Sequence, residues 1–235
     1  MAEAKSAGAR ARDHLSVRFH GGSKVYTLPD RLPAFKLRHG QVLWLLNELG
    51  YGSGVSASAF YEYIKSLRKL GIPFGHTKFQ NKRGKRLADY SYYHLMEIML
   101  TLSLRVYHVV PDSVLKEIIR YRTHLCRFYR RAYAQRLTGA GESIVIRANG
   151  CKPITLRGLF LDLNIAFVGG HLVRFGPPRL LSPAKALEQF TRRGASAAVF
   201  TPMNLSLLSE QVVTLALQAP HIHSGPRKSR PSTAR

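Results

Sequence analysis

The sequence is short of acidic residues, with 13 Asp and Glu against 36 Lys and Arg among 235 residues. Acid–base and metal-dependent enzymes need carboxylates close together, and no segment that resembles a cleft supplies such a pair. We therefore expect no enzyme and no catalytic residue. Asp162 is the acid that could be a buried functional carboxylate, although an outward position on a strand is the ordinary interpretation of its place between two leucines.

Cysteine is almost absent too: Cys126 and Cys151 have no spacing that suggests a zinc site or a disulfide framework. His221 and His223 are the only close histidine pair, and they lack a third ligand nearby. No apolar run approaches the roughly 18 residues of a membrane-spanning helix. The expectation is a cytoplasmic protein with no metal, no cofactor and no membrane partner.

What the sequence has in excess is positive charge, with a net charge of +23 and a pI near 10.7. The 45% hydrophobic and 10% aromatic fractions are those of a globular chain, so the charge does not indicate general disorder. Residues 33–137 carry eighteen basic residues against six acids. This segment is expected to face phosphate groups.

Two helices are predicted near the start of that segment, at about residues 38–49 and 58–70, separated by a break at residues 50–54. Ser56 or Ser58 supplies an N-cap for the second helix, and Gly71 ends it. Apolar residues at helical spacing give this helix one inner stripe, and its other faces are polar and cationic. Such a helix can pack on a scaffold and still enter a groove of nucleic acid.

A β-hairpin is predicted next, with strands through residues 72–79 and 86–90 and a turn at residues 81–84. Its tip is crowded with cations, which repel one another unless an anion is bound. These cations are Lys78, Lys82, Arg83, Lys85 and Arg86. A third helix is expected to begin at Asp89 or Ser91.

A further helix is expected after Pro111, capped by Asp112 or Ser113 and running to about Leu137. Its arginine-rich later half is interpreted either as a second phosphate contact or as a solvated connector.

The composition changes at residues 139–141, where we place a domain boundary. Strands are predicted at residues 143–148 and 154–167, a Gly169-Gly170 turn leads to another strand at 171–175, and helices follow at 183–190 and 204–217. The predicted fold class is α+β: an N-terminal helical winged helix-turn-helix domain, followed by a small β-rich α+β domain. The predicted divisions are a flexible basic arm (1–32), the winged-helix domain (33–137), the small domain for dimerisation, partner or ligand binding (143–217), and a disordered basic tail (218–235).

The order helix, turn, helix, hairpin, helix resembles the DNA-binding domain of the MerR family of transcription regulators over roughly residues 35–121. The segments that carry the resemblance are Gly54-Val55-Ser56, Gly71-Ile72, Arg86 to Tyr90, Tyr92 to Leu104 and Pro111 to Ile118. The span from Val55 to Gly71 is about a turn longer than the family pattern, and the family's long coiled coil and cysteine-rich loop are absent. The resemblance implies a winged-helix fold that binds double-stranded DNA.

The predicted function is sequence-specific binding of double-stranded DNA by a bacterial, nucleoid-associated transcription regulator, expected to be a homodimer. Lys65 and Arg68 would donate to guanine, while Ser58, Tyr61 and Lys69 would contact phosphates. The hairpin cations would lie along phosphates or in a neighbouring minor groove.

Two alternatives remain open at this point. In an RNA-binding or ribosome-associated protein, Tyr90, Tyr92 and Tyr93 would stack on exposed bases. Packing of these tyrosines in a core is the other interpretation of the same pattern. A phosphate-handling enzyme that uses the C-terminal region is the remaining, less favoured alternative.

Overall fold

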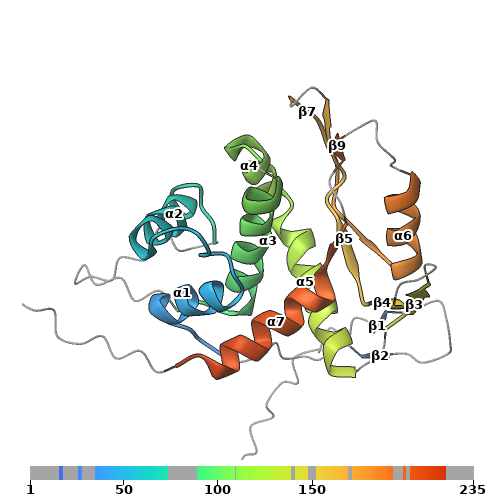
Figure 1. Cartoon of the computed structure of the whole chain (residues 1–235), viewed down its shortest axis with the longest axis horizontal. Coiled ribbons are helices and arrows are strands. Elements are labelled where there is room, and N and C mark those ends of the chain that lie inside the picture. Colours follow the sequence, from blue (N-terminus) through green and yellow to red (C-terminus); the bar gives the residue numbers. More distant parts are fainter. Residues whose placement is uncertain are drawn as a thin grey trace, which may run out of the picture. The chain divides into compact units, whose positions relative to one another are not determined.

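The computed structural model describes residues 16–17, 26–27, 35–73, 89–108, 110–138, 141–147, 152–168, 171–192, 198–199 and 202–220. The chain divides into two compact units, residues 1–31 and residues 32–235. In the first unit, β1 (Ser16–Val17) pairs antiparallel with β2 (Tyr26–Thr27). All other elements described below belong to the second unit (Figure 1).

The two predicted N-terminal helices are confirmed as α1 (His39–Glu48) and α2 (Ala57–Lys69). Ser56 caps α2, since its hydroxyl accepts a hydrogen bond from the backbone N–H of Ala59 at 3.2 Å. Gly71 follows the last turn of α2 with a backbone φ of +83°, a conformation that residues other than glycine rarely adopt. Local sequence signals therefore set both ends of α2.

The third predicted helix is α3 (Tyr92–His108), and His94 helps to cap its start. The backbone N–H of Ser91 donates to Nδ1 of His94 at 3.1 Å, which requires a lone pair on that nitrogen. Burial lowers the pKa of His94, as does the charge of Arg122, while a hydrogen bond with the Asp89 backbone opposes the shift. The half-buried imidazole is thus held in its neutral form.

This cap predicts a pH dependence of stability. An unfolded histidine titrates at pH ~6.5. Because the folded-state pKa is lower, the unfolded chain binds a proton first as the pH falls, and stability is lost from about pH 6.5 downward. In His94→Gln the amide oxygen can accept the same bond without titrating. We expect urea denaturation at pH 5 and pH 7.5 to show a smaller acid loss for this variant than for the wild type, and parallel losses would contradict the assignment.

The helix predicted from Pro111 to Leu137 is wrong as a single element, because it is two helices, α4 (Asp112–Arg120) and α5 (Arg122–Thr138). Tyr121 leaves the helical conformation, with φ of −94° and ψ of 11°. The predicted cap by Asp112 or Ser113 is also wrong. Pro111 occupies the cap position without a side-chain hydrogen bond, and Asp112 instead forms an ion pair with Arg105 of α3.

The core of the second unit is shared by the N-terminal helices and by α7 (Leu205–Gln218). Helix α7 packs against α1, α3 and α5, as Figure 1 shows. At their junction the Tyr92 hydroxyl donates to the Tyr129 carbonyl at 2.9 Å and lies 2.7 Å from the Ser209 hydroxyl. The structure therefore joins in one compact unit what the sequence analysis divided at residues 139–141.

The C-terminal sheets are small and antiparallel, and their strands are shorter than predicted. The segment 154–167 is divided into β4 (Ile154–Arg157), β5 (Phe160–Asp162) and most of β6 (Ile165–Val168). Gly158 and Asn164, with φ of 105° and 51°, turn the chain between them. The continuous run of strand-forming residues from 154 to 167 did not indicate either turn.

Strand pairing among the described residues gives three groups in this unit. β3 (Ser143–Ile146) pairs with β4; β5 lies between β8 (Arg179–Leu181) and β10 (Met203–Asn204); and β6 lies between β7 (His171–Phe175) and β9 (Ala198–Val199). The predicted Gly-Gly hairpin is confirmed as β6–β7. Helix α6 (Pro183–Arg192) begins at the predicted proline. The mixed α+β class is therefore confirmed.

The end of α7 corrects a further expectation. The tail was expected to lose order from residue 218, yet α7 includes Gln218, and Gln41 of α1 donates to the Pro220 carbonyl at 3.0 Å. Residues 221–235 lie outside the described part of the chain.

Candidate nucleic-acid interface

Helix α2 separates an apolar inner face from a polar outer face. Phe60, Ile64 and Leu67 are buried in the core. Burial of such side chains contributes roughly 1.5–3 kcal/mol each, enough to hold the helix on the unit. The residues of the outer face are Ser58, Tyr61, Glu62, Lys65, Ser66 and Lys69. Four of the five predicted α2 site residues therefore share the accessible side of the helix.

Two of these outer residues, Lys65 and Glu62, form an ion pair. Lys65 Nζ lies 3.1 Å from Glu62 Oε1, and the side chains are 43% and 61% exposed. An exposed pair of this kind contributes about 0–1 kcal/mol. It would not prevent Lys65 from exchanging its carboxylate partner for a phosphate.

Arg68, the fifth predicted residue, is placed differently. Its guanidinium donates to the Tyr90 hydroxyl, and Nη2 lies 2.6 Å from Nδ1 of His39, which must be the acceptor because a guanidinium only donates. The guanidinium carbon also lies 5.8 Å from the centre of the Tyr90 ring. Arg68 thus ties α2 to α1 and to the start of α3, instead of reaching outward to a base as expected.

Tyr90 also connects the segment before α3 to the segment before α1. Its backbone pairs antiparallel with Leu37, with N–H to carbonyl distances of 2.8 and 3.0 Å. This bridge sets the chain at the end of the predicted hairpin beside the segment that enters α1. Of the predicted hairpin, with strands at 72–79 and 86–90, residues 74–88 lie outside the described residues, and so do all five of its predicted cations, Lys78, Lys82, Arg83, Lys85 and Arg86.

The tyrosines that could have stacked on RNA bases are mostly core residues. Tyr90 and Tyr92 are 0% and 1% exposed, and Tyr93 is half-buried. Burial raises the pKa of all three hydroxyls. The core-packing interpretation is confirmed for Tyr90 and Tyr92, so neither forms an open stacking platform.

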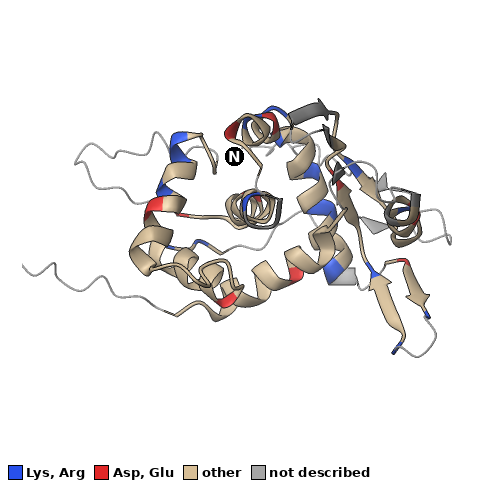
Figure 2. Cartoon of the chain, turned by 45° about the horizontal axis from the view of Figure 1, so that its top comes forward, with Lys and Arg blue, Asp and Glu red and all other residues tan. Residues whose placement is uncertain are grey.

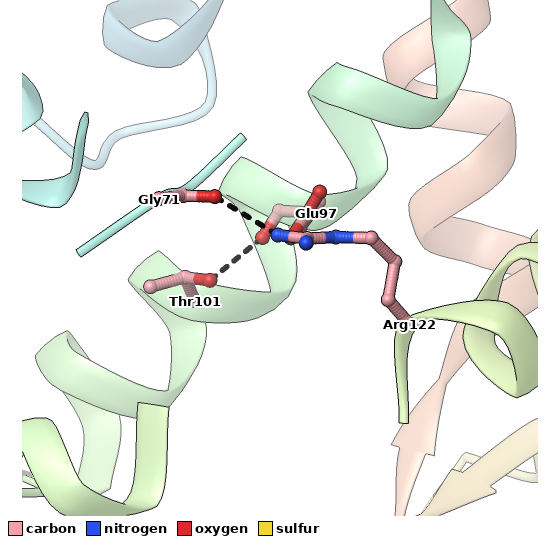
Figure 3. Close-up of polar contacts among 4 residues, drawn as sticks. All are labelled: Gly71, Glu97, Thr101 and Arg122. Atoms are coloured by element: carbon pink, nitrogen blue, oxygen red, sulfur yellow. Dashed lines mark hydrogen bonds and ion pairs between the residues drawn. The ribbon is translucent and has the colours of Figure 1, made fainter. Parts of the chain in front are cut away.

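The same C-terminal end of α2 is anchored by a second arginine, Arg122, which the sequence pattern did not single out (Figure 3). Arg122 Nε donates to Oε1 of the buried Glu97 at 2.9 Å, and Nη2 contacts the same oxygen. Nη2 also donates to the Gly71 carbonyl at 2.9 Å. Thr101 donates to the Glu97 backbone carbonyl at 2.8 Å, one turn along α3. The end of α2 is thereby held by α3 and α5.

Glu97 could have been noticed from the sequence, since it is the one acid within the apolar run from Leu95 to Leu100. A charge in such a run needs a partner when the helix is buried. Its partner was not predictable, because Arg122 is one of six closely spaced arginines between residues 120 and 136. His39, the acceptor for Arg68, gave no signal beyond its position at the start of a helix.

Helices α4 and α5, which come later in the chain than α2, carry further exposed cations. Figure 2 shows the basic residues in blue. Lys116, Arg120 and Arg127 are exposed, and Arg120 lies 3.5 Å from Glu117. Arg131 is half-buried, and burial lowers its pKa. The basic residues of α4 and α5 are thus mixed: Arg122 supports the fold, while Lys116, Arg120 and Arg127 are exposed and accessible to an anion.

Asp162 is buried, so its expected outward position on the strand is wrong. Its side chain is 0% exposed. It accepts from the Asn164 backbone N–H at 2.8 Å, from Gln189 at 3.3 Å and from Arg179 at 3.4 Å. These contacts link the turn that follows β5 with β8 and with α6. They give the buried carboxylate of Asp162 a structural role.

The described residues contain no group of three or more His, Cys, Asp or Glu that could hold a metal ion. Within the same residues, no helix is both long enough and apolar enough to cross a bilayer. No protein-family model matches this sequence, and neither does any curated protein or solved structure. A function must therefore be inferred from the geometry of α2 and of the residues that hold it, Arg68 and Arg122.

Proposed function

We propose that this protein binds double-stranded DNA through a winged helix-turn-helix arrangement, with α2 as the recognition helix. The observation that carries the proposal is the outer face of α2, where Ser58, Tyr61, Lys65 and Lys69 are accessible while the opposite face is buried. A helix held in this way can enter a major groove with its polar side chains forward.

The surroundings of α2 support the same function. Arg68 and Arg122 attach its last turn to the rest of the unit. The predicted hairpin would be the wing, and the Leu37–Tyr90 bridge pairs its last residue with the segment that enters α1. The order of elements predicted from the sequence resembles that of the MerR DNA-binding domain. The proposed biological role is transcription regulation, in a protein that works as a homodimer.

Salt dependence tests the proposal directly. Each phosphate neutralised on duplex DNA contributes about −0.9 to the slope of log K against log salt. If six or more phosphates are contacted, affinity should fall on the order of 10³-fold or more between 50 and 200 mM salt. Lys65→Ala and Lys69→Ala should each reduce the slope by about 0.9. Fluorescence anisotropy with a labelled duplex measures both quantities.

Lys185→Ala is the matched control, because this exposed lysine on α6 removes the same charge at a distant site. It should leave the slope unchanged. Binding to single-stranded RNA in preference to duplex DNA, or equal slopes for all three variants, would contradict the proposal.

A further inference from the structure

The β3–β4 hairpin is a two-stranded ribbon that packs against α6 through β3 and is joined to the unit at its base. Leu156 packs against a small apolar cluster near α6. Asn204 donates to the Arg157 carbonyl at 3.0 Å, and the Gly158 N–H donates to the Glu142 carbonyl at 3.3 Å. Beyond these contacts the ribbon projects from the rest of the unit (Figure 2).

The two faces of the ribbon differ. Side chains alternate along a strand, so Ile144, Ile146, Ile154 and Leu156 share a face; Ile154 is 60% exposed and the other three are half-buried. The residues of the opposite face are Ser143, Val145, Arg147, Thr155 and Arg157, and all are exposed. An entire sheet face is therefore accessible, with a cation at each end and apolar or hydroxyl side chains between them.

The positive charge of the ribbon indicates that its exposed face suits an anionic partner. Arg147, Lys152 and Arg157 lie on or beside the two strands, and Glu142 at the base is the only acid between residues 139 and 161. Arginine, lysine, serine and threonine are the side chains that donate to phosphate oxygens. A major groove of B-form DNA admits a two-stranded ribbon as well as a helix.

We infer that the β3–β4 ribbon is a second nucleic-acid contact, with Arg147 and Lys152 binding phosphates of duplex DNA. This inference rests on the proposed function. A second copy of the chain is a poorer occupant, since a stable interface buries roughly 800 Å² per partner and strands of four residues offer far less. Two copies would also bring like charges together.

The test compares three variants that each remove one positive charge: Arg147→Ala, Lys152→Ala and Lys185→Ala. The third residue lies on α6, which packs against β3, so it controls for net charge in the same region. We expect Arg147→Ala and Lys152→Ala each to reduce the slope of log K against log salt by about 0.9, and Lys185→Ala to leave it unchanged. All three residues are exposed, and circular dichroism should show wild-type folding.

The outcomes separate this inference from the proposed function. If the wild type fails to bind duplex DNA, both are overturned. If Lys65→Ala and Lys69→Ala reduce the slope while the ribbon variants behave like Lys185→Ala, only the inference is overturned. It is also overturned if the ribbon variants change the monomer–dimer equilibrium in sedimentation without changing the slope, because the ribbon would then join two copies.

Discussion

Replacing Arg122 with alanine is expected to lower the free energy of unfolding by about 3–5 kcal/mol, the cost of leaving a buried charge without its partner. Glu97 lies in α3 with a side chain only 7% exposed, and the Arg122 guanidinium contacts one of its oxygens twice. Without Arg122 the carboxylate loses a charged partner in a poorly solvated site. The Gly71 carbonyl loses a donor at the same time. Urea denaturation followed by circular dichroism measures the loss.

A paired variant distinguishes the ion pair from simple loss of packing. Glu97→Leu combined with Arg122→Met removes both charges and keeps apolar volume, and such replacements of buried ion pairs are often neutral or stabilising. We expect most of the lost stability to return in this double variant. A loss below about 1 kcal/mol in Arg122→Ala would be the size of an exposed pair, and it would contradict the structural role assigned here.

The same double variant links stability to the proposed DNA contact. Its core is intact, yet the end of α2 no longer has the hydrogen bond from Arg122 to Gly71. If that bond positions the recognition helix, DNA affinity should stay below the wild-type value although stability has recovered. Recovery of both together would show that Arg122 supports the fold alone.

The helices were largely predictable from the sequence because their signals are local. In α2 the apolar spacing, the Ser56 cap and the Gly71 stop all lie within sixteen residues, and each acts through bonds inside that segment. The strands were harder, because the backbone turns at Gly158 and Asn164 depend on partners elsewhere. A Cβ added to Gly158 would lie 2.6 Å from Cβ of Ser206, on α7.

The candidate site was only partly predictable for the same reason. Helical periodicity places Ser58, Tyr61, Lys65 and Lys69 on one side of α2 without knowledge of any other element. Arg68 also carries the charge expected of a contact residue, but its direction is decided by His39 and Tyr90, which lie 29 and 22 residues away. Tertiary contacts of this kind turn a cation inward, and no local pattern reveals them.

The largest loss of DNA affinity is expected from removing the cations of the predicted wing. Lys82, Arg83, Lys85 and Arg86, replaced together by alanine, should reduce the slope of log K against log salt by up to about 3.6, four times the effect of one phosphate contact. At 50 mM salt the affinity should fall by at least about 100-fold. Anisotropy titrations over a range of salt concentrations measure both.

The tail provides a control of equal charge. It contains Arg227, Lys228, Arg230 and Arg235, and replacing these four by alanine changes the net charge from +23 to +19, as the wing variant does. If general attraction to the polyanion is all that matters, the two variants will lose the same affinity, and the wing must be removed from the proposed interface. If the wing variant alone has the flatter slope, its cations contact phosphates directly.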